Sequence, residues 1–142
     1  MQTTWVKDYE ISIQEAPDYH WYSYDSKNYD KVFHLTSAED FTRTILLTIK
    51  RAHQEKKVVL VVPYYTIVDH CALPAGNRLF LMLNDLLCLF NLESLDIDKQ
   101  QKLDTIGTMF ASYPYKQDFI LYGELDIFRV TSNLSIQWQF SG

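Results

Sequence analysis

Residues 119–140 have the sequence FILYGELDIFRVTSNLSIQWQF, which determines what we expect of the last part of the chain. From Leu134 to Phe140 apolar and polar residues alternate strictly, which is the period of a β-strand with one buried and one polar face. Two dipeptides that suit tight turns, Gly123-Glu124 and Ser132-Asn133, divide the stretch. The sequence therefore predicts a meander of three strands, over residues 119–122, 125–131 and 134–140.

Other strands are expected nearer the start of the chain. Tyr9 to Gln14 alternates in the same way, and Val58 to Val62 is β-branched and continuously apolar, as in a central strand covered on both faces. The aromatic run from Tyr19 to Asp25 has high strand propensity. Val32 to Leu35 is a short candidate strand. These runs predict a sheet in the first half of the chain.

Three helices are expected between the strands. Ser37 resembles an N-cap for a helix reaching about Gln54, with Phe41, Ile45 and Ile49 on one stripe. A second helix is expected over 78–90, because Asn77, Asn84 and Asn91 recur every seven residues around an otherwise apolar stretch. A capping-box-like start at 98–101 predicts a third helix, with Leu103, Ile106 and Phe110 inside. The expected fold class is α+β, with a mainly antiparallel sheet and about three helices in the order ββ(β)-α-β-α-α-βββ, as a single domain of residues 1–142.

Composition narrows the class of protein. The chain has 142 residues, of which 47% are hydrophobic, and thirteen Lys and Arg against eighteen Asp and Glu give a net charge of −5. This balance argues against a general nucleic-acid binder and against docking on an anionic membrane. The first residues lack a charged segment followed by an apolar one, so we expect a cytoplasmic protein in which Cys71 and Cys88 are reduced.

Catalytic and metal-binding patterns are weak. Asp69-His70-Cys71 would suit a small hydrolase with Cys71 as the nucleophile and His70 as its base, and this is kept as an alternative. The four histidines have no metal-ligand spacing, and the glycines are isolated. We therefore expect no enzyme activity, no catalytic residue, no metal and no cofactor.

The strongest functional signal is the run from Asp18 to Asp30, which holds five aromatic residues and three aspartates. Tyr and Trp dominate binding hot spots, whereas a Tyr-rich strand packed under other elements explains the run equally well. Acidity gathers in the terminal regions: residues 1–36 have a net charge of −3 and residues 118–142 of −2. If the two regions share a sheet, they form an acidic, aromatic-rich surface. The predicted partner-binding residues are Asp18, Tyr19, Trp21, Tyr22, Tyr24, Asp25, Tyr29, Asp30, Glu124 and Asp126.

In its size, its acidity and the acidic aromatic run 18–30, the chain resembles the immunity proteins of bacterial toxin–immunity systems, including those of contact-dependent growth inhibition. The resemblance implies a protein that binds and neutralises a cognate toxin domain, often a nuclease with a basic cleft, without touching nucleic acid or membrane itself. An acidic surface would steer such a partner into contact. An acidic secretion chaperone is the other alternative.

Overall fold

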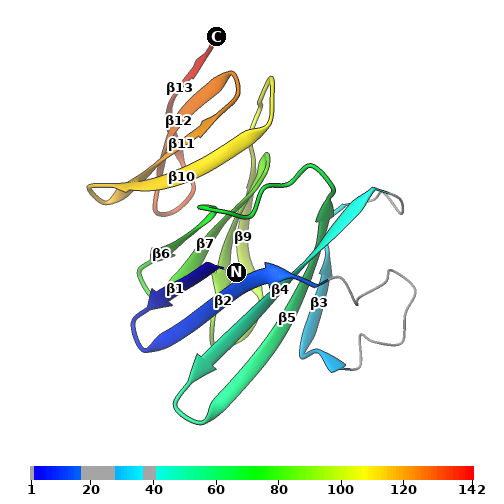
Figure 1. The fold of residues 1–142 in the computed structure, drawn as a ribbon. Coiled ribbons are helices and arrows are strands. Elements are labelled where there is room, and N and C mark those ends of the chain that lie inside the picture. The colour runs from blue at the N-terminus through cyan, green and yellow to red at the C-terminus, as the bar shows by residue number, and fades with distance from the viewer. Residues whose placement is uncertain (1, 17–27, 37–40) are drawn as a thin grey trace. The chain divides into compact units, whose positions relative to one another are not determined.

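The computed structural model describes residues 2–16, 28–36 and 41–142 (Figure 1). Within these ranges the chain forms thirteen β-strands and no α-helix, so the expectation of an α+β fold with three helices is wrong. The expectation of a mainly antiparallel arrangement agrees with the strand pairing, in which β3 with β5 is the one parallel pair among the described strands. The chain divides into two compact units, Met1–Tyr65 and Thr66–Gly142, and the single domain stays a prediction.

The first unit is a five-stranded sheet in the order β1-β2-β4-β5-β3. The expected strands at 9–14 and 58–62 are confirmed, and the latter residues are fully buried. On one side of the sheet Tyr29 and Val32 pack against a small cluster that includes Val59. The strands are β1 (Gln2–Val6), β2 (Tyr9–Glu15), β3 (Lys31–His34), β4 (Thr42–Arg51) and β5 (Gln54–Pro63).

The second unit contains two four-stranded sheets, in the orders β6-β7-β8-β9 and β10-β11-β12-β13. One apolar cluster draws side chains from both sheets, and the rings of Phe80 and Phe119 stack across it with centroids 4.4 Å apart. The expected C-terminal meander is confirmed as three consecutive antiparallel strands. The strands are β6 (Ala72–Ala75), β7 (Arg78–Leu83), β8 (Leu86–Asn91), β9 (Ile97–Lys102), β10 (Met109–Tyr115), β11 (Asp118–Gly123), β12 (Asp126–Thr131) and β13 (Ile136–Ser141).

Each of the three expected helices falls on strands. Residues 78–90 form the β7–β8 hairpin, and its residues 79–83 and 87–90 are all buried, so both faces are apolar and no two-residue alternation marks the strands. The seven-residue recurrence of asparagine is the spacing of turns: Asn77 and Asn84 lie in two-residue turns, and Asn91 Oδ1 accepts hydrogen bonds from two backbone N–H groups of the next turn. Two turns of an α-helix also span about seven residues, so a seven-residue recurrence of polar residues fits a helix as well as a series of turns.

The other two helices fail for related reasons. Residues 45–49 of β4 are all buried, so apolar and polar residues do not alternate there as they do in a half-buried strand. The same residues also fit the apolar stripe of a helix. The capping-box-like residues 98–101 lie inside β9, where burial alternates along the strand. Among the described residues, no helix has the length and apolarity needed to cross a membrane.

The turn residue Asn84 has a positive φ of 57°, and its buried side chain accepts a hydrogen bond from the Met109 N–H at 3.0 Å. Asn84→Ala is expected to lower the free energy of unfolding by about 2–3 kcal/mol, because it leaves that N–H unsatisfied and places a Cβ-bearing residue without a polar side chain in the left-handed region. Urea denaturation measures the change. Asn77→Ala, in an exposed turn, is the control and should cost at most a few tenths of a kcal/mol. Equal losses in the two variants would contradict this role of Asn84.

Candidate protein-binding surface

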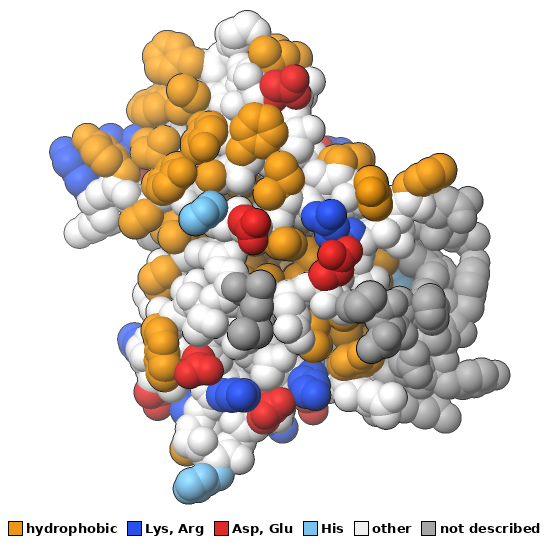
Figure 2. Space-filling model, viewed as in Figure 1, with side chains coloured by type: hydrophobic (Ala, Val, Ile, Leu, Met, Phe, Trp, Pro, Cys, Tyr) orange, Lys and Arg blue, Asp and Glu red, His pale blue; other side chains and the backbone are white. Residues whose placement is uncertain are grey.

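Large apolar side chains are exposed together on the outer face of the β10–β13 sheet. We call this set the aromatic face, and hydrophobic side chains gather over these strands in Figure 2. The exposed fractions run from 37% to 69%, which is unusual for so many rings in one sheet. The aromatic face consists of Phe110, Tyr113, Tyr115, Tyr122, Ile127, Trp138 and Phe140.

Strand register explains why these residues share one face. Directly paired residues of antiparallel strands project to the same side. One row crosses the sheet from Tyr113 through Ile120 and Arg129 to Trp138. The next row contains Tyr122, Ile127 and Phe140. Both rows therefore belong to a single continuous surface.

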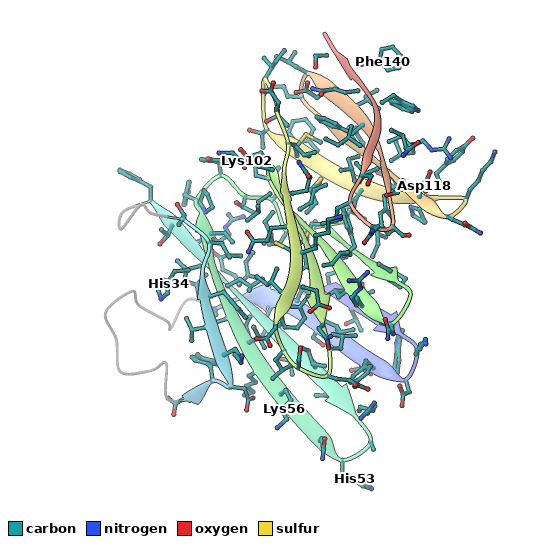
Figure 3. All side chains as sticks on the ribbon, turned by 180° about the vertical axis from the view of Figure 1, so that it is seen from behind. His34, His53, Lys56, Lys102, Asp118 and Phe140 are labelled. Carbon is teal, nitrogen blue, oxygen red and sulfur yellow. The ribbon has the colours of Figure 1, made fainter. Side chains whose placement is uncertain are left out.

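Strand β13 presents its apolar side to solvent. Gln139 pairs with Phe128, which is fully buried, so the glutamine lies on the inner side of the sheet, where its Nε2 donates to the Asp104 carbonyl at 2.8 Å. Trp138 and Phe140 consequently lie on the outer side, and Phe140 projects away from the ribbon in Figure 3. The expectation that the apolar residues of 134–140 form a buried face is wrong for β13, although Leu134 just before it is buried.

Ring contacts order the aromatic face. The rings of Tyr113 and Tyr122 are nearly parallel, with centroids 5.8 Å apart, and Phe110 meets Tyr122 edge-on at 6.3 Å. Trp138 and Phe140 lie 5.4 Å apart at the other edge of the sheet. The hydrogen bond between the Tyr113 and Tyr122 hydroxyls raises the pKa of Tyr113, because it favours the protonated Tyr113 hydroxyl. These contacts limit the motion of the rings relative to one another.

Two cationic side chains lie beside Tyr115 on this face: Lys116 Nζ is 5.5 Å from the ring centroid, and Arg129 is paired with a carboxylate. Arg129 Nε donates to Asp118 Oδ2 at 2.8 Å, and the same guanidinium lies over the Tyr115 ring at 5.0 Å. Residues 66–142 carry five Lys and Arg against nine Asp and Glu, a net charge of −4. Most of the net negative charge of the chain, −4 of −5, therefore belongs to the unit that bears the aromatic face.

A pocket of about 420 Å³ lies at one end of the aromatic face, beside the turn between β11 and β12. Its apolar walls come from Tyr122, Leu125, Ile127 and Phe140, and Glu124 and Asp126 also line it. Phe140 and Asp118 lie toward opposite ends of the sheet in Figure 3, so the Arg129–Asp118 pair is remote from the pocket.

The predicted partner-binding residues do not form one surface among the described residues. Tyr29 packs partly buried against the cluster of the first unit, while Asp30 is exposed and accepts a hydrogen bond from the Lys57 N–H at 2.8 Å. Glu124 is exposed and borders the aromatic face. Six of the predicted residues lie outside the described residues: Asp18, Tyr19, Trp21, Tyr22, Tyr24 and Asp25.

Asp126 is buried and serves the fold. Its carboxylate accepts hydrogen bonds from the Ser141 hydroxyl and from the Ile106 N–H, the latter at 2.8 Å. The Ser141 hydrogen bond, helped by those from Ile106, Gln139 and Gly107, holds the pKa of Asp126 below its ordinary value against the opposing effect of desolvation. The carboxylate thus ties the end of β13 to β12 and to the segment before β10.

This network predicts an acid-sensitive contribution to stability. Because the folded pKa of Asp126 is depressed, the contribution is present above the unfolded pKa near 4 and is lost as the pH falls through the folded value. Asp126→Asn is expected to lower the free energy of unfolding by about 1–3 kcal/mol at pH 7 and by much less at pH 2.5. Urea denaturation at both pH values measures this. Ser141→Ala should show a smaller loss with the same pH trend, and a loss independent of pH would contradict the assignment.

The surroundings of Cys71 do not support a cysteine nucleophile, and the described residues offer no metal site. The thiol is buried, and desolvation raises its pKa to about 12, so it is protonated at neutral pH. An activated nucleophile needs the opposite shift. Among the described residues, no group of three or more His, Cys, Asp and Glu side chains is placed to hold a metal ion.

Sequence reasoning missed most of the aromatic face. The sequence pattern predicts Phe110 on the inside of a helix, and Trp138 and Phe140 on a buried strand face. Tyr113 and Tyr115 flank Pro114 with strand spacing, and proline within a strand is typical of a sheet edge. That signal could have identified an exposed edge strand with two outward tyrosines.

Comparisons with known proteins give no family for the chain. No protein-family model matches it, and a search of curated proteins finds no match either. The class is therefore defined here by the structure alone, as two compact units built from β-sheets, one with an exposed aromatic sheet face.

Proposed function

We propose that this chain is a non-catalytic protein-binding module, namely an immunity protein that neutralises a cognate toxin domain with a basic surface. It would act in the cytoplasm, where such a domain must be blocked. The observation that carries the proposal is the orientation of β13, which leaves Trp138 and Phe140 exposed on the outer side of the sheet, while Gln139 pairs with buried Phe128 and lies on the inner side.

The aromatic face has the properties of a protein-binding surface. Contiguous exposed apolar patches on a folded protein mark interaction sites, and Trp and Tyr contribute most to binding energy where they occur at an interface. The tyrosine hydroxyls offer hydrogen bonds that an aliphatic patch would lack. Among the described residues, the aromatic face best supports partner binding, and residues 18–27 of the predicted aromatic run lie outside them.

Charge favours a basic partner. The unit bearing the aromatic face has a net charge of −4, and its Arg129 is paired with Asp118. Such a surface attracts a basic domain over distances comparable to the Debye length and accelerates association. A toxin nuclease, whose cleft must bind phosphates, is a partner of this kind.

The proposal is tested with the product of the neighbouring gene. We expect that protein to co-purify with this chain, and cells that express it to survive when this chain is also present. The association rate should fall as ionic strength rises. Absence of binding and of protection would contradict the proposal, as would a stable homodimer that buries the aromatic face.

A further inference from the structure

The pocket beside the β11–β12 turn combines aromatic walls with a carboxylate at its rim. We propose that it binds an arginine side chain of the partner protein, an inference that rests on the proposed function and names the chemistry recognised at one end of the same site. Tyr122 and Phe140 provide aromatic lining, Leu125 and Ile127 provide aliphatic lining, and Glu124 provides negative charge. Its volume of about 420 Å³ is small for a ligand pocket and accommodates a single long side chain.

The backbone fixes where Glu124 lies. The Glu124 N–H donates to the Thr108 carbonyl at 2.8 Å, which anchors the turn. This close approach requires glycine at position 123, since a Cβ there would lie 2.5 Å from the same carbonyl oxygen. The Glu124 side chain passes close to Gly107, where an added Cβ would be 3.0 Å from Glu124 Oε2. The backbone of the turn that carries Glu124 is therefore fixed, and it sets where the side chain begins.

The two carboxylates of the pocket differ in availability. Asp126 already accepts hydrogen bonds from Ser141 and Ile106, so it has little left to offer a ligand. None of the ion pairs recorded among the described residues involves Glu124, which is exposed. A cation entering the pocket would thus meet one available carboxylate above an apolar floor.

These features favour arginine over other side chains. A guanidinium stacks on aromatic faces and pairs with a carboxylate in a planar, bidentate geometry, and its aliphatic stem packs on apolar surface. A lysine ammonium is more strongly hydrated and lacks the planar fork. A neutral side chain of the same shape would leave Glu124 without a charge partner.

The test uses amino-acid derivatives as probes and needs no partner protein. N-acetyl-arginine amide is titrated into the ¹⁵N-labelled chain and followed by NMR chemical shifts, beside N-acetyl-lysine amide and the uncharged N-acetyl-citrulline amide. We expect saturable shifts at Glu124, Leu125 and Phe140 in the millimolar range, with citrulline at least about fivefold weaker and lysine weaker than arginine. Equal binding of arginine and citrulline, lysine binding as tight as arginine, or no saturable shift at the pocket would each overturn the proposal.

Variants locate the contact. Glu124→Gln is expected to weaken arginine binding about fivefold, whereas Glu93→Gln, an exposed glutamate on another turn of the same unit, should leave it unchanged. Equal effects of the two variants would mean that net charge and not the pocket attracts the probe. Partner binding that persists in Glu124→Gln but is lost on substitution of the aromatic face would refute the arginine pocket while leaving the proposed function standing.

Discussion

Phe128→Ala is expected to lower the free energy of unfolding by about 3–5 kcal/mol. Phe128 is fully buried at the centre of β12 and belongs to the cluster that draws on both sheets of the second unit. Truncation removes most of a ring from a packed interior and leaves a cavity that the paired strands cannot close. The total free energy of unfolding of a small protein is about 5–15 kcal/mol, so a loss of this size is a large fraction of it. Urea denaturation followed by circular dichroism measures the loss.

Phe140→Ala is the matched control for this substitution. Phe140 lies on the next strand of the same sheet, and 69% of it is exposed. Its truncation should change the free energy of unfolding by no more than about 0.5 kcal/mol. A loss in Phe140→Ala as large as that in Phe128→Ala would mean that the outer face of this sheet is core, and the proposed binding surface would then be untenable.

The strands that sequence reasoning predicted are those with a simple burial pattern. Tyr9 to Gln14 alternates, and Val58 to Val62 is β-branched throughout, so propensity and periodicity point to the same element. The β7–β8 hairpin is different because both of its faces are buried and its leucines suit a helix at least as well as a strand. These residues form strands because other parts of the fold cover both faces of the hairpin, and a short stretch of sequence does not reveal that burial.

The candidate site was only partly accessible from sequence for a similar reason. Alternation in 134–140 establishes that β13 has two different faces, but it does not establish which face meets the core. Pairing decides this, since Gln139 stands opposite buried Phe128 and Trp138 stands opposite Arg129. The sheet register is set by turns and neighbouring strands, so the exposure of Trp138 follows only from the three-dimensional arrangement.

Trp138→Ala is expected to weaken binding to the toxin partner at least about 30-fold, equivalent to about 2 kcal/mol. Trp138 lies in the row of Tyr113, Ile120 and Arg129 and contacts the ring of Phe140, so its truncation removes contact area and also loosens its neighbour. The free protein should lose about 1–2 kcal/mol of stability, since 37% of this residue is exposed on an edge strand and the rest is covered. Isothermal titration calorimetry with the co-purified partner measures the affinity.

Trp5→Ala supplies the control for this prediction, because Trp5 is also an exposed tryptophan on a strand but belongs to the first unit, with 58% of its surface exposed. If the aromatic face is the docking surface, Trp5→Ala should change the affinity less than about threefold. Equal weakening by the two substitutions would indicate non-specific hydrophobic capture. A loss of affinity in Trp5→Ala alone would move the interface to the first unit, since Trp138 would then be an exposed residue without a binding role.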